Sequence, residues 1–111
     1  MQSSLAVSTA FVLISASLRV IQSDEACKNL AASFNHVTDR IGVPLCTADN
    51  GTLTFPYIPS VEKCMERCDQ QLGKQCLAYT YYTDSGMCAV FNTTPRNYKR
   101  QQACFSYRVR K

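Results

Sequence analysis

Cysteine spacing constrains the fold of this chain more than any other feature of its sequence. The stretch CMERCDQQLGKQC, residues 64–76, holds three cysteines, and the chain has seven cysteines among 111 residues. A chain of this length forms one small domain, whose core is marginal because small domains bury a smaller share of their surface. Cysteines at this density bind a metal, carry out thiol–disulfide chemistry or cross-link a small fold.

The first residues indicate the compartment in which these cysteines fold. Leu5 to Leu18 reads LAVSTAFVLISASL, which carries no charge and is shorter than the roughly 20 apolar residues of a membrane span. This pattern is typical of a signal peptide, although no Lys or Arg precedes it. We expect a signal peptide over residues 1–23, cleaved between residues 16 and 23, and a mature domain over residues 24–111. A signal anchor is the alternative.

An exported chain folds in an oxidising environment and is used outside the cell. We therefore expect a secreted, extracellular protein without a stable membrane span. Two sequons, Asn50-Gly51-Thr52 and Asn92-Thr93-Thr94, are compatible with export and make Asn50 and Asn92 candidate N-glycosylation sites. Disulfide bonds are therefore expected to form in the mature chain.

The clearest element of the mature chain is a helix that begins after Ser60. The Ser60 hydroxyl can cap the first turn, and Gly73 supplies a left-handed stop. Apolar residues between them share one helical face: Val61, Cys64, Met65, Cys68 and Leu72. Cys64 and Cys68 therefore lie one turn apart, on the side that faces the core.

The rest of the mature chain has the character of strands and turns. We expect strands over residues 33–41, 76–82, 87–91 and 104–110, a turn at 83–86 and a loop over 92–102. Residues 52–58 are expected to form an edge strand or an extended arm because they contain Pro56. In the last strand, Phe105, Tyr107 and Val109 alternate with Arg108 and Arg110. The predicted fold class is α+β, with one helix packed on an antiparallel β-sheet.

The spacing of the cysteines argues against metal binding and thiol catalysis. From Cys64 onward it is C-x3-C-x7-C-x11-C, whereas zinc sites and catalytic dithiols use C-x2-C pairs. Cβ atoms at helix positions i and i+4 are roughly 5–6 Å apart, and a disulfide needs about 3.8 Å. Cys64 and Cys68 should therefore each bond to a different strand and serve as structural cross-links.

The stretch SVEKCMERCDQQLGKQCLAYTYYTDSGMCAVF, Ser60 to Phe91, resembles the PAN/Apple domain family. That family has a helix with C-x3-C, a third cysteine that opens a strand with aromatic residues, a polar turn and a cysteine on the next strand. These places are occupied here by Cys64, Cys68, Cys76, Tyr79, Tyr81 and Cys88. The resemblance implies a small disulfide-stapled PAN/Apple-like domain with the pairs Cys64–Cys88 and Cys68–Cys76.

Three cysteines remain: Cys27, Cys46 and Cys104. The resemblance implies that the first and last strands run antiparallel and are tied together. Cys104 begins the last strand and should face the end of the first, which Cys46 follows, so we expect Cys46–Cys104, with Cys27–Cys104 as the alternative. An odd cysteine, here Cys27, suggests an intermolecular bond in a secreted protein, such as a disulfide-linked dimer, or a capped thiol.

No catalytic apparatus is recognisable in the sequence. His36 is the only histidine and is expected to be an ordinary surface residue without catalytic companions. Neither a nucleophile motif nor a phosphate-binding loop occurs. We therefore predict a protein that is not an enzyme, with no cofactor, no metal and no nucleic-acid partner.

The charge distribution carries the clearest functional signal. The net charge is +4, and half of the 12 basic residues follow the last acidic residue, Asp84. They are the candidate anion-binding residues Arg96, Lys99, Arg100, Arg108, Arg110 and Lys111. This end can attract sulfated glycans or acidic protein surfaces, and some domains of the PAN/Apple family bind heparin. A solvated basic tail is the alternative.

Together these features predict a secreted, non-enzymatic binding module. It would recognise an extracellular protein or an anionic, heparin-like glycan through surface loops and the basic C-terminal face. Tyr81, Tyr82 and Tyr98 can stack on a sugar or pack in the sheet. The alternative is a secreted effector, such as a protease inhibitor or toxin-like disulfide-rich protein, with residues 92–102 as its reactive loop.

Overall fold

A computed structural model describes residues 27–110 of the chain. The predicted signal peptide and Lys111 lie outside the described residues. After a helical segment at residues 27–32, the elements follow in the order β1 (Phe34–His36), β2 (Leu45–Thr47), β3 (Leu53–Phe55), α2 (Val61–Leu72), the 3-10 turn η1 (Gly73–Gln75), β4 (Ala78–Tyr82), β5 (Met87–Phe91), β6 (Tyr98–Arg100) and β7 (Cys104–Val109). Within residues 27–110, no helix has the length and apolar character needed to cross a membrane.

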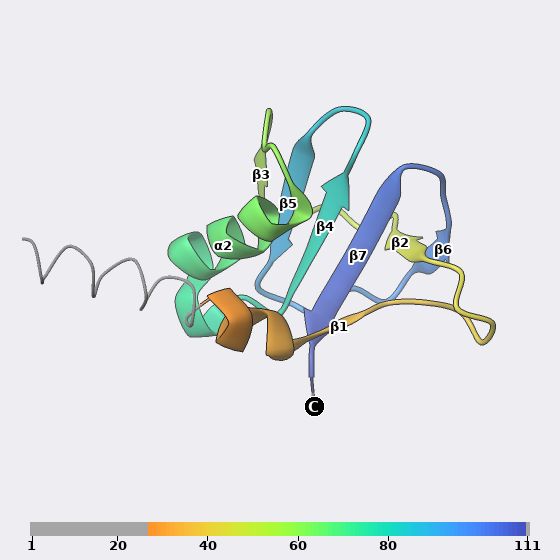
Figure 1. The fold of residues 1–111 in the computed structure, drawn as a ribbon, viewed down its shortest axis with the longest axis horizontal. Coiled ribbons are helices and arrows are strands. Elements are labelled where there is room, and N and C mark those ends of the chain that lie inside the picture. The colour runs from red at the N-terminus through yellow and green to blue at the C-terminus, as the bar shows by residue number, and fades with distance from the viewer. Residues whose placement is uncertain (1–26, 111) are drawn as a thin grey trace, which may run out of the picture.

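The strands form one large antiparallel sheet and one small ribbon (Figure 1). The sheet has the order β1-β7-β4-β5-β3, and β2 pairs with β6 alone. The last strand therefore lies between the first strand and β4, antiparallel to both. Helix α2 packs on β4 and β5, while the β2–β6 ribbon packs on β7. The α+β prediction of one helix on an antiparallel sheet is confirmed, and the separate ribbon is an addition to it.

Helix α2 begins and ends where its sequence signals predict. Ser60 is the N-cap, and its hydroxyl accepts a hydrogen bond from the Lys63 backbone N–H at 3.2 Å. At the other end Gly73, with a φ of 56°, donates its backbone N–H to the Asp69 carbonyl. The positive φ at this position favours glycine and ends the helix.

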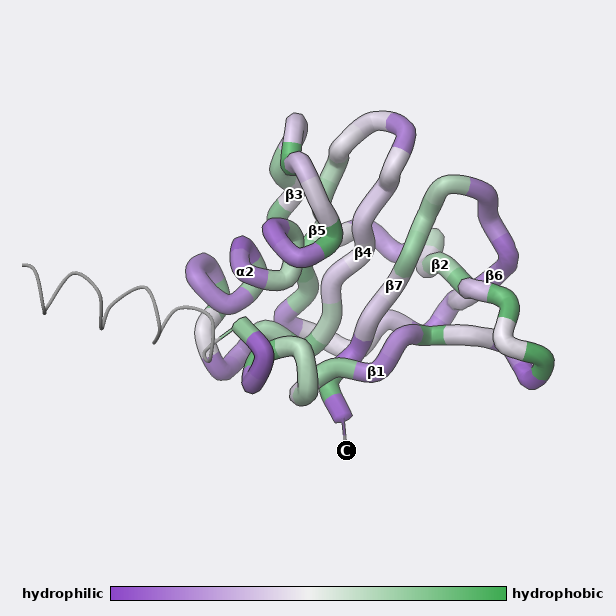
Figure 2. Tube along the Cα trace, in the orientation of Figure 1, coloured by the Kyte–Doolittle hydropathy of each residue, from purple (hydrophilic) through white to green (hydrophobic). Residues whose placement is uncertain are grey.

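The main core lies between α2 and the sheet. Its fully or nearly buried members are Phe34, Ile58, Cys64, Met65, Cys68, Cys76, Tyr79, Tyr81, Cys88 and Val90. Tyr79 stacks on Tyr107 at 5.0 Å between ring centroids and meets Phe34 edge-on, also at 5.0 Å. Figure 2 shows hydrophilic residues on the outer turns of α2 and on the turn between β6 and β7.

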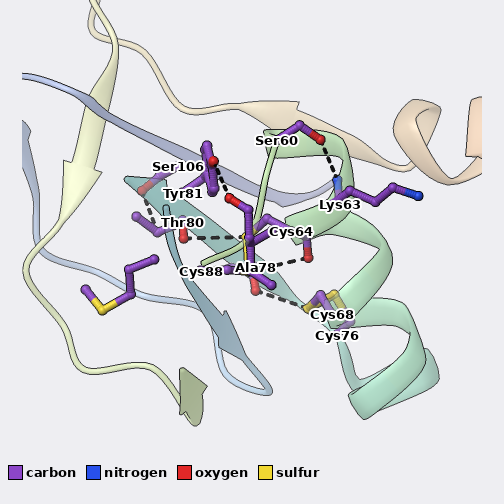
Figure 3. Close-up of a disulfide and its surroundings, with 12 residues drawn as sticks. Ser60, Lys63, Cys64, Cys68, Cys76, Ala78, Thr80, Tyr81, Cys88 and Ser106 are labelled. Carbon is purple, nitrogen blue, oxygen red and sulfur yellow. Dashed lines mark hydrogen bonds between the residues drawn. A yellow bond between two sulfur atoms is a disulfide. The ribbon is translucent and has the colours of Figure 1, made fainter. Parts of the chain in front are cut away.

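Three disulfides cross-link these layers. Cys64–Cys88 joins α2 to β5, and Cys68–Cys76 joins α2 to the segment that leads into β4 (Figure 3). Cys46–Cys104 joins β2 to β7. These are the pairs expected above, with Cys46 rather than Cys27 as the partner of Cys104 and with Cys27 as the free cysteine.

The strand predicted over residues 33–41 is shorter in the structure. β1 ends at His36 because the chain turns at Asp39, whose Oδ1 accepts hydrogen bonds from the backbone N–H groups of Ile41 and Val43 at 3.0 and 2.9 Å. The edge strand predicted over residues 52–58 is β3, and it does lie at the edge of the sheet.

The loop predicted over residues 92–102 is wrong for its central part, because Tyr98–Arg100 form β6. The reason is that β6 is too short and polar to show a strand pattern and exists through its pairing with β2. The last strand also differs from the expected alternation. Its first half is also buried on the side turned away from α2, with Ser106 1% exposed, because the β2–β6 ribbon covers that side, whereas Arg108 and Arg110 are exposed as expected.

Candidate anion-binding surface

The β2–β6 ribbon positions several of the predicted basic residues beside β7. Its anchor is the Cys46–Cys104 disulfide. Next to it, the Thr47 backbone N–H donates to the Ser106 hydroxyl at 3.2 Å, and that hydroxyl lies 2.7 Å from the Thr80 hydroxyl. Buried polar groups are stable only when hydrogen-bonded, so this three-residue network fixes the ribbon on the sheet.

The connection from β5 to β6 is fastened by Asp49. One carboxylate oxygen accepts the Arg96 backbone N–H at 3.0 Å, and the other accepts the Asn97 side-chain amide at 2.9 Å. These bonds lower the pKa of Asp49, and the bond from the Arg96 backbone N–H has the largest effect. The carboxylate therefore holds the backbone of this connection, while the Arg96 side chain is exposed.

Arg96 and Arg108 meet around Tyr98. They line a surface pocket, here called the Tyr98 pocket, formed by Thr93, Thr94, Pro95, Arg96, Tyr98 and Arg108. The guanidinium carbon of Arg108 lies 5.9 Å from the centroid of the Tyr98 ring, a distance at which a cation is attracted to an aromatic face. No acidic side chain lines this pocket.

The Tyr98 hydroxyl differs from the buried hydroxyls of Ser106 and Thr80 nearby, which are hydrogen-bonded. It is buried and finds no hydrogen-bond partner among the described residues. Burial raises the pKa of Tyr98, so the hydroxyl keeps its proton at neutral pH and remains a donor. An unsatisfied buried hydroxyl is costly by about 1–3 kcal/mol, and such a group calls for an explanation such as strain, a chemical role, or a bound water or ion.

A second pocket adjoins the first and shares Thr94 and Arg108 with it. Its other lining residues are Asn35 and Val109. Arg110 donates its Nε hydrogen to the Asn35 side-chain oxygen at 2.9 Å, which places this guanidinium at the same end of β7. Arg108 therefore stands between two pockets at a positively charged edge of the molecule.

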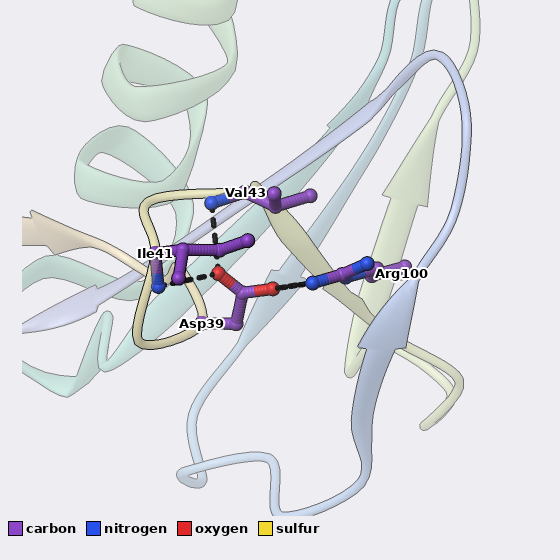
Figure 4. Close-up of polar contacts among 4 residues, drawn as sticks. All are labelled: Asp39, Ile41, Val43 and Arg100. Atoms are coloured by element: carbon purple, nitrogen blue, oxygen red, sulfur yellow. Dashed lines mark hydrogen bonds and ion pairs between the residues drawn. The ribbon is translucent and has the colours of Figure 1, made fainter.

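Arg100 lies apart from this edge. Its guanidinium pairs with the Asp39 carboxylate, with Nε 2.9 Å from Oδ2 (Figure 4). The pKa of Asp39 is lowered by the N–H of Val43 first and by Arg100 among the further causes. Because its charge is offset by a neighbouring carboxylate, Arg100 contributes little to a field that attracts anions.

The predicted anion-binding residues thus lie in different local surroundings. Arg96 and Arg108 surround Tyr98, and Arg110 lies at the end of the same strand as Arg108. Lys99 is exposed in the middle of β6. Lys111 falls outside the described residues. Thr93 and Thr94, which also line the Tyr98 pocket, carry no binding signal in the sequence beyond their place directly before the basic run.

The tyrosines proposed for sugar stacking are placed unfavourably for that role. Tyr81 is only 6% exposed and its hydroxyl donates to the Ile58 carbonyl at 2.6 Å, so of the two roles considered for it, Tyr81 has that of a core residue. Tyr82 is half-buried at the end of β4. Arg108 already occupies one face of the Tyr98 ring.

The two sequons come together at the β3 edge of the sheet. Asn50 and Asn92 are both exposed. The Thr52 hydroxyl of the first sequon donates to the Asn92 side-chain oxygen at 2.9 Å and accepts the Asn92 backbone N–H at 3.0 Å. Glycans on these residues would share this edge, and Asn92 directly precedes Thr93 of the Tyr98 pocket.

The other predictions from the sequence concern Cys27, His36, metal binding and a reactive loop. Cys27 is half-buried in the helical segment beside α2. His36 is exposed and stacks on Tyr107 at 4.7 Å. No group of three or more histidines, cysteines or acidic residues within residues 27–110 is arranged to hold a metal. The candidate reactive loop is partly strand, since β6 takes up its centre.

Comparison with known families agrees with this architecture. The profile of the PAN domain family matches residues 43–109, more than half of the chain. The chain belongs to the PAN domain family. Members of this family are generally non-catalytic modules that bind proteins or carbohydrates, and they occur in extracellular proteins. Comparisons with curated proteins and with solved structures found no significant match to this PAN domain.

Proposed function

We propose that this PAN domain is an exported binding module that recognises a sulfated, heparin-like glycan through its basic edge. The observation that carries the proposal is the placement of Arg96 and Arg108 around Tyr98 without an acidic side chain in the pocket lining. Within residues 27–110 the ion pairs are Lys63–Glu66 and Asp39–Arg100. Both arginines of the pocket therefore keep their charge available for an external anion.

The chemistry of the edge favours a sulfated glycan over a neutral sugar. Arginine presents a planar set of donors that matches the oxygens of a sulfate or carboxylate group. A neutral sugar would instead need an open aromatic face, and Arg108 already lies over the Tyr98 ring. Heparin-like chains carry both sulfate and carboxylate groups and are abundant outside cells, where the predicted signal peptide would deliver the protein.

Heparin chromatography of the mature protein tests this proposal. We expect elution well above physiological ionic strength of about 0.15 M, and retention should fall steeply with salt because the contacts are electrostatic. A column of chemically desulfated heparin, which keeps its carboxylates, is the control. Equal retention on both columns, or elution from heparin at physiological salt, would contradict recognition of sulfate groups.

A further inference from the structure

We infer that the Tyr98 pocket is a discrete site for one sulfate group, with Arg96 and Arg108 as its charged ligands and the Tyr98 hydroxyl as an additional donor. This inference deepens the proposed function and rests on it for the glycan as the source of the sulfate. A discrete sulfate site of this kind is distinct from the diffuse positive charge of the C-terminal segment.

The donors that line the pocket match the needs of a sulfate ester. Two guanidinium groups and two threonine hydroxyls, from Arg96, Arg108, Thr93 and Thr94, line the same pocket. A sulfate ester has three terminal oxygens that accept several hydrogen bonds each, so it can use donors that converge from different sides. Positively charged donors form the stronger of these bonds.

Tyr98 distinguishes this pocket from an ordinary patch of surface arginines. Tyr98 lines the pocket, and its hydroxyl is buried without a hydrogen-bond partner among residues 27–110; an anion that displaces the side chains covering the hydroxyl would supply that partner. The lining side chains of Thr94, Arg96 and Arg108 are exposed, so they can move apart to admit a small anion. Binding then satisfies a donor that the free protein leaves unsatisfied.

The backbone around the pocket is held in place before any ligand arrives, while its exposed side chains stay free to adjust. Asp49 fixes the backbone of Arg96, and the Tyr98 ring restrains Arg108. The ribbon that carries Tyr98 is fastened to β7 by the Cys46–Cys104 disulfide. Pre-organised donors lose less conformational entropy on binding, which favours a defined anion site over non-specific attraction.

A pair of charge-matched variants tests the site. Arg96→Ala/Arg108→Ala removes two positive charges from the pocket, and Lys99→Ala/Arg100→Ala removes two from the adjacent strand. We expect the first variant to bind heparin about 10- to 100-fold more weakly, the range for losing charge-assisted hydrogen bonds. The second should change affinity by less than about threefold, because Lys99 and Arg100 lie outside the lining of the Tyr98 pocket and Arg100 is already paired with Asp39.

Tyr98→Phe provides a finer test, because it removes the hydroxyl and keeps the ring. We expect heparin affinity to fall roughly threefold to tenfold, the effect of one hydrogen bond, while the melting temperature stays the same or rises. A hydroxyl with a purely structural role would show the opposite pattern, with a lower melting temperature and unchanged affinity, and that result would overturn its assignment as a ligand.

Inorganic sulfate, followed by backbone amide chemical shifts, separates failure of the site from failure of the proposed function. Wild-type shifts confined to the Tyr98 pocket and lost in Arg96→Ala/Arg108→Ala would support the site even if heparin does not bind. Equal loss of heparin affinity in both double variants would overturn the site while leaving glycan binding intact. Absence of both heparin binding and sulfate-dependent shifts would overturn site and function together.

Discussion

Removal of the Cys46–Cys104 disulfide is expected to destabilise this PAN domain more than removal of either other disulfide. The perturbation is the double variant Cys46→Ala/Cys104→Ala. In the folded state the ribbon keeps its backbone contacts to the rest of the domain, such as the Leu45 N–H bond to the Val37 carbonyl at 2.9 Å. The main effect should therefore arise in the unfolded chain, which loses a constraint.

The size of the effect follows from the sequence separation of each pair. Cys46 and Cys104 are 58 residues apart, for which loop-closure entropy gives about 4 kcal/mol. Cys64–Cys88, with a separation of 24, gives about 3.5 kcal/mol, and Cys68–Cys76, with a separation of 8, gives about 2.5 kcal/mol. All six half-cystines are buried, so the three double variants lose similar packing energy. The predicted order of destabilisation therefore follows the loop-closure entropy.

Urea denaturation followed by circular dichroism measures these differences. The dependence of the unfolding free energy on urea should also steepen in each variant, because a less constrained unfolded chain exposes more surface. Cys27→Ala is the matched control, since it removes a sulfur without breaking a disulfide, and should cost less than about 1 kcal/mol. The loop-closure argument is refuted if Cys68→Ala/Cys76→Ala destabilises the domain as much as Cys46→Ala/Cys104→Ala.

Three further predictions concern backbone strain, acid stability and glycosylation. Gly86→Ala should lower the free energy of unfolding, measured by thermal denaturation, more than Gly42→Ala does. Both glycines have a positive φ, which is unfavourable for alanine by about 1–2 kcal/mol, but only at Gly86 would the new Cβ lie 3.2 Å from a backbone carbonyl oxygen. Equal losses in the two variants would contradict this reasoning. The pKa of Asp39 is lowered from 3.8, so its stabilisation is complete above that pH and is lost as the pH falls through the lower, folded-state value; Asp39→Asn should flatten the acid limb of stability against pH, and an unchanged limb would argue against it. Treatment with peptide N-glycosidase should lower the mass of the exported protein in two steps, of which Asn92→Gln removes one, and a mass unchanged by the enzyme would show that neither sequon is occupied.

The elements that the sequence predicts well are those specified by neighbouring residues. Helix α2 carries its own cap at Ser60, its own stop at Gly73 and a continuous apolar face, all within fourteen consecutive positions. The β4–β5 hairpin has apolar strands on both sides of a polar turn. In both cases the information lies within a few turns or strand lengths, which is the range that periodicity and capping can detect.

The features that the sequence conceals depend on contacts between distant segments. Strand β6 is polar and three residues long, and it exists because β2, more than 50 positions earlier, pairs with it. The burial of Ser106 has the same origin, since the ribbon covers it. A serine and three polar residues carry no strand or core signal of their own, so a single sequence gives no basis for predicting either feature.

The candidate site, too, has features that the local sequence predicts and features that depend on distant contacts. Counting charges after Asp84 located the basic segment, but it treated Arg96, Arg100 and Arg108 as equivalent. Asp39, about 60 residues earlier in the chain, neutralises one of them, and the burial of Tyr98 singles out the other two. Charge composition thus predicts the general region of a binding surface, whereas the residues that remain available depend on the tertiary pairing of each charge.

The position of β7 between β1 and β4 has a consequence for the order of folding. Until β7 is present, β1 has no neighbour in the sheet, and the buried Ser106 is missing from beneath the ribbon. The helix and the β4–β5 hairpin can associate early through contacts close in sequence, but the sheet closes only when its C-terminal strand inserts. During synthesis the domain therefore cannot complete its fold until the residues of β7, Cys104–Val109, are available. Its rate-limiting contacts are long-range, and such topologies fold slowly.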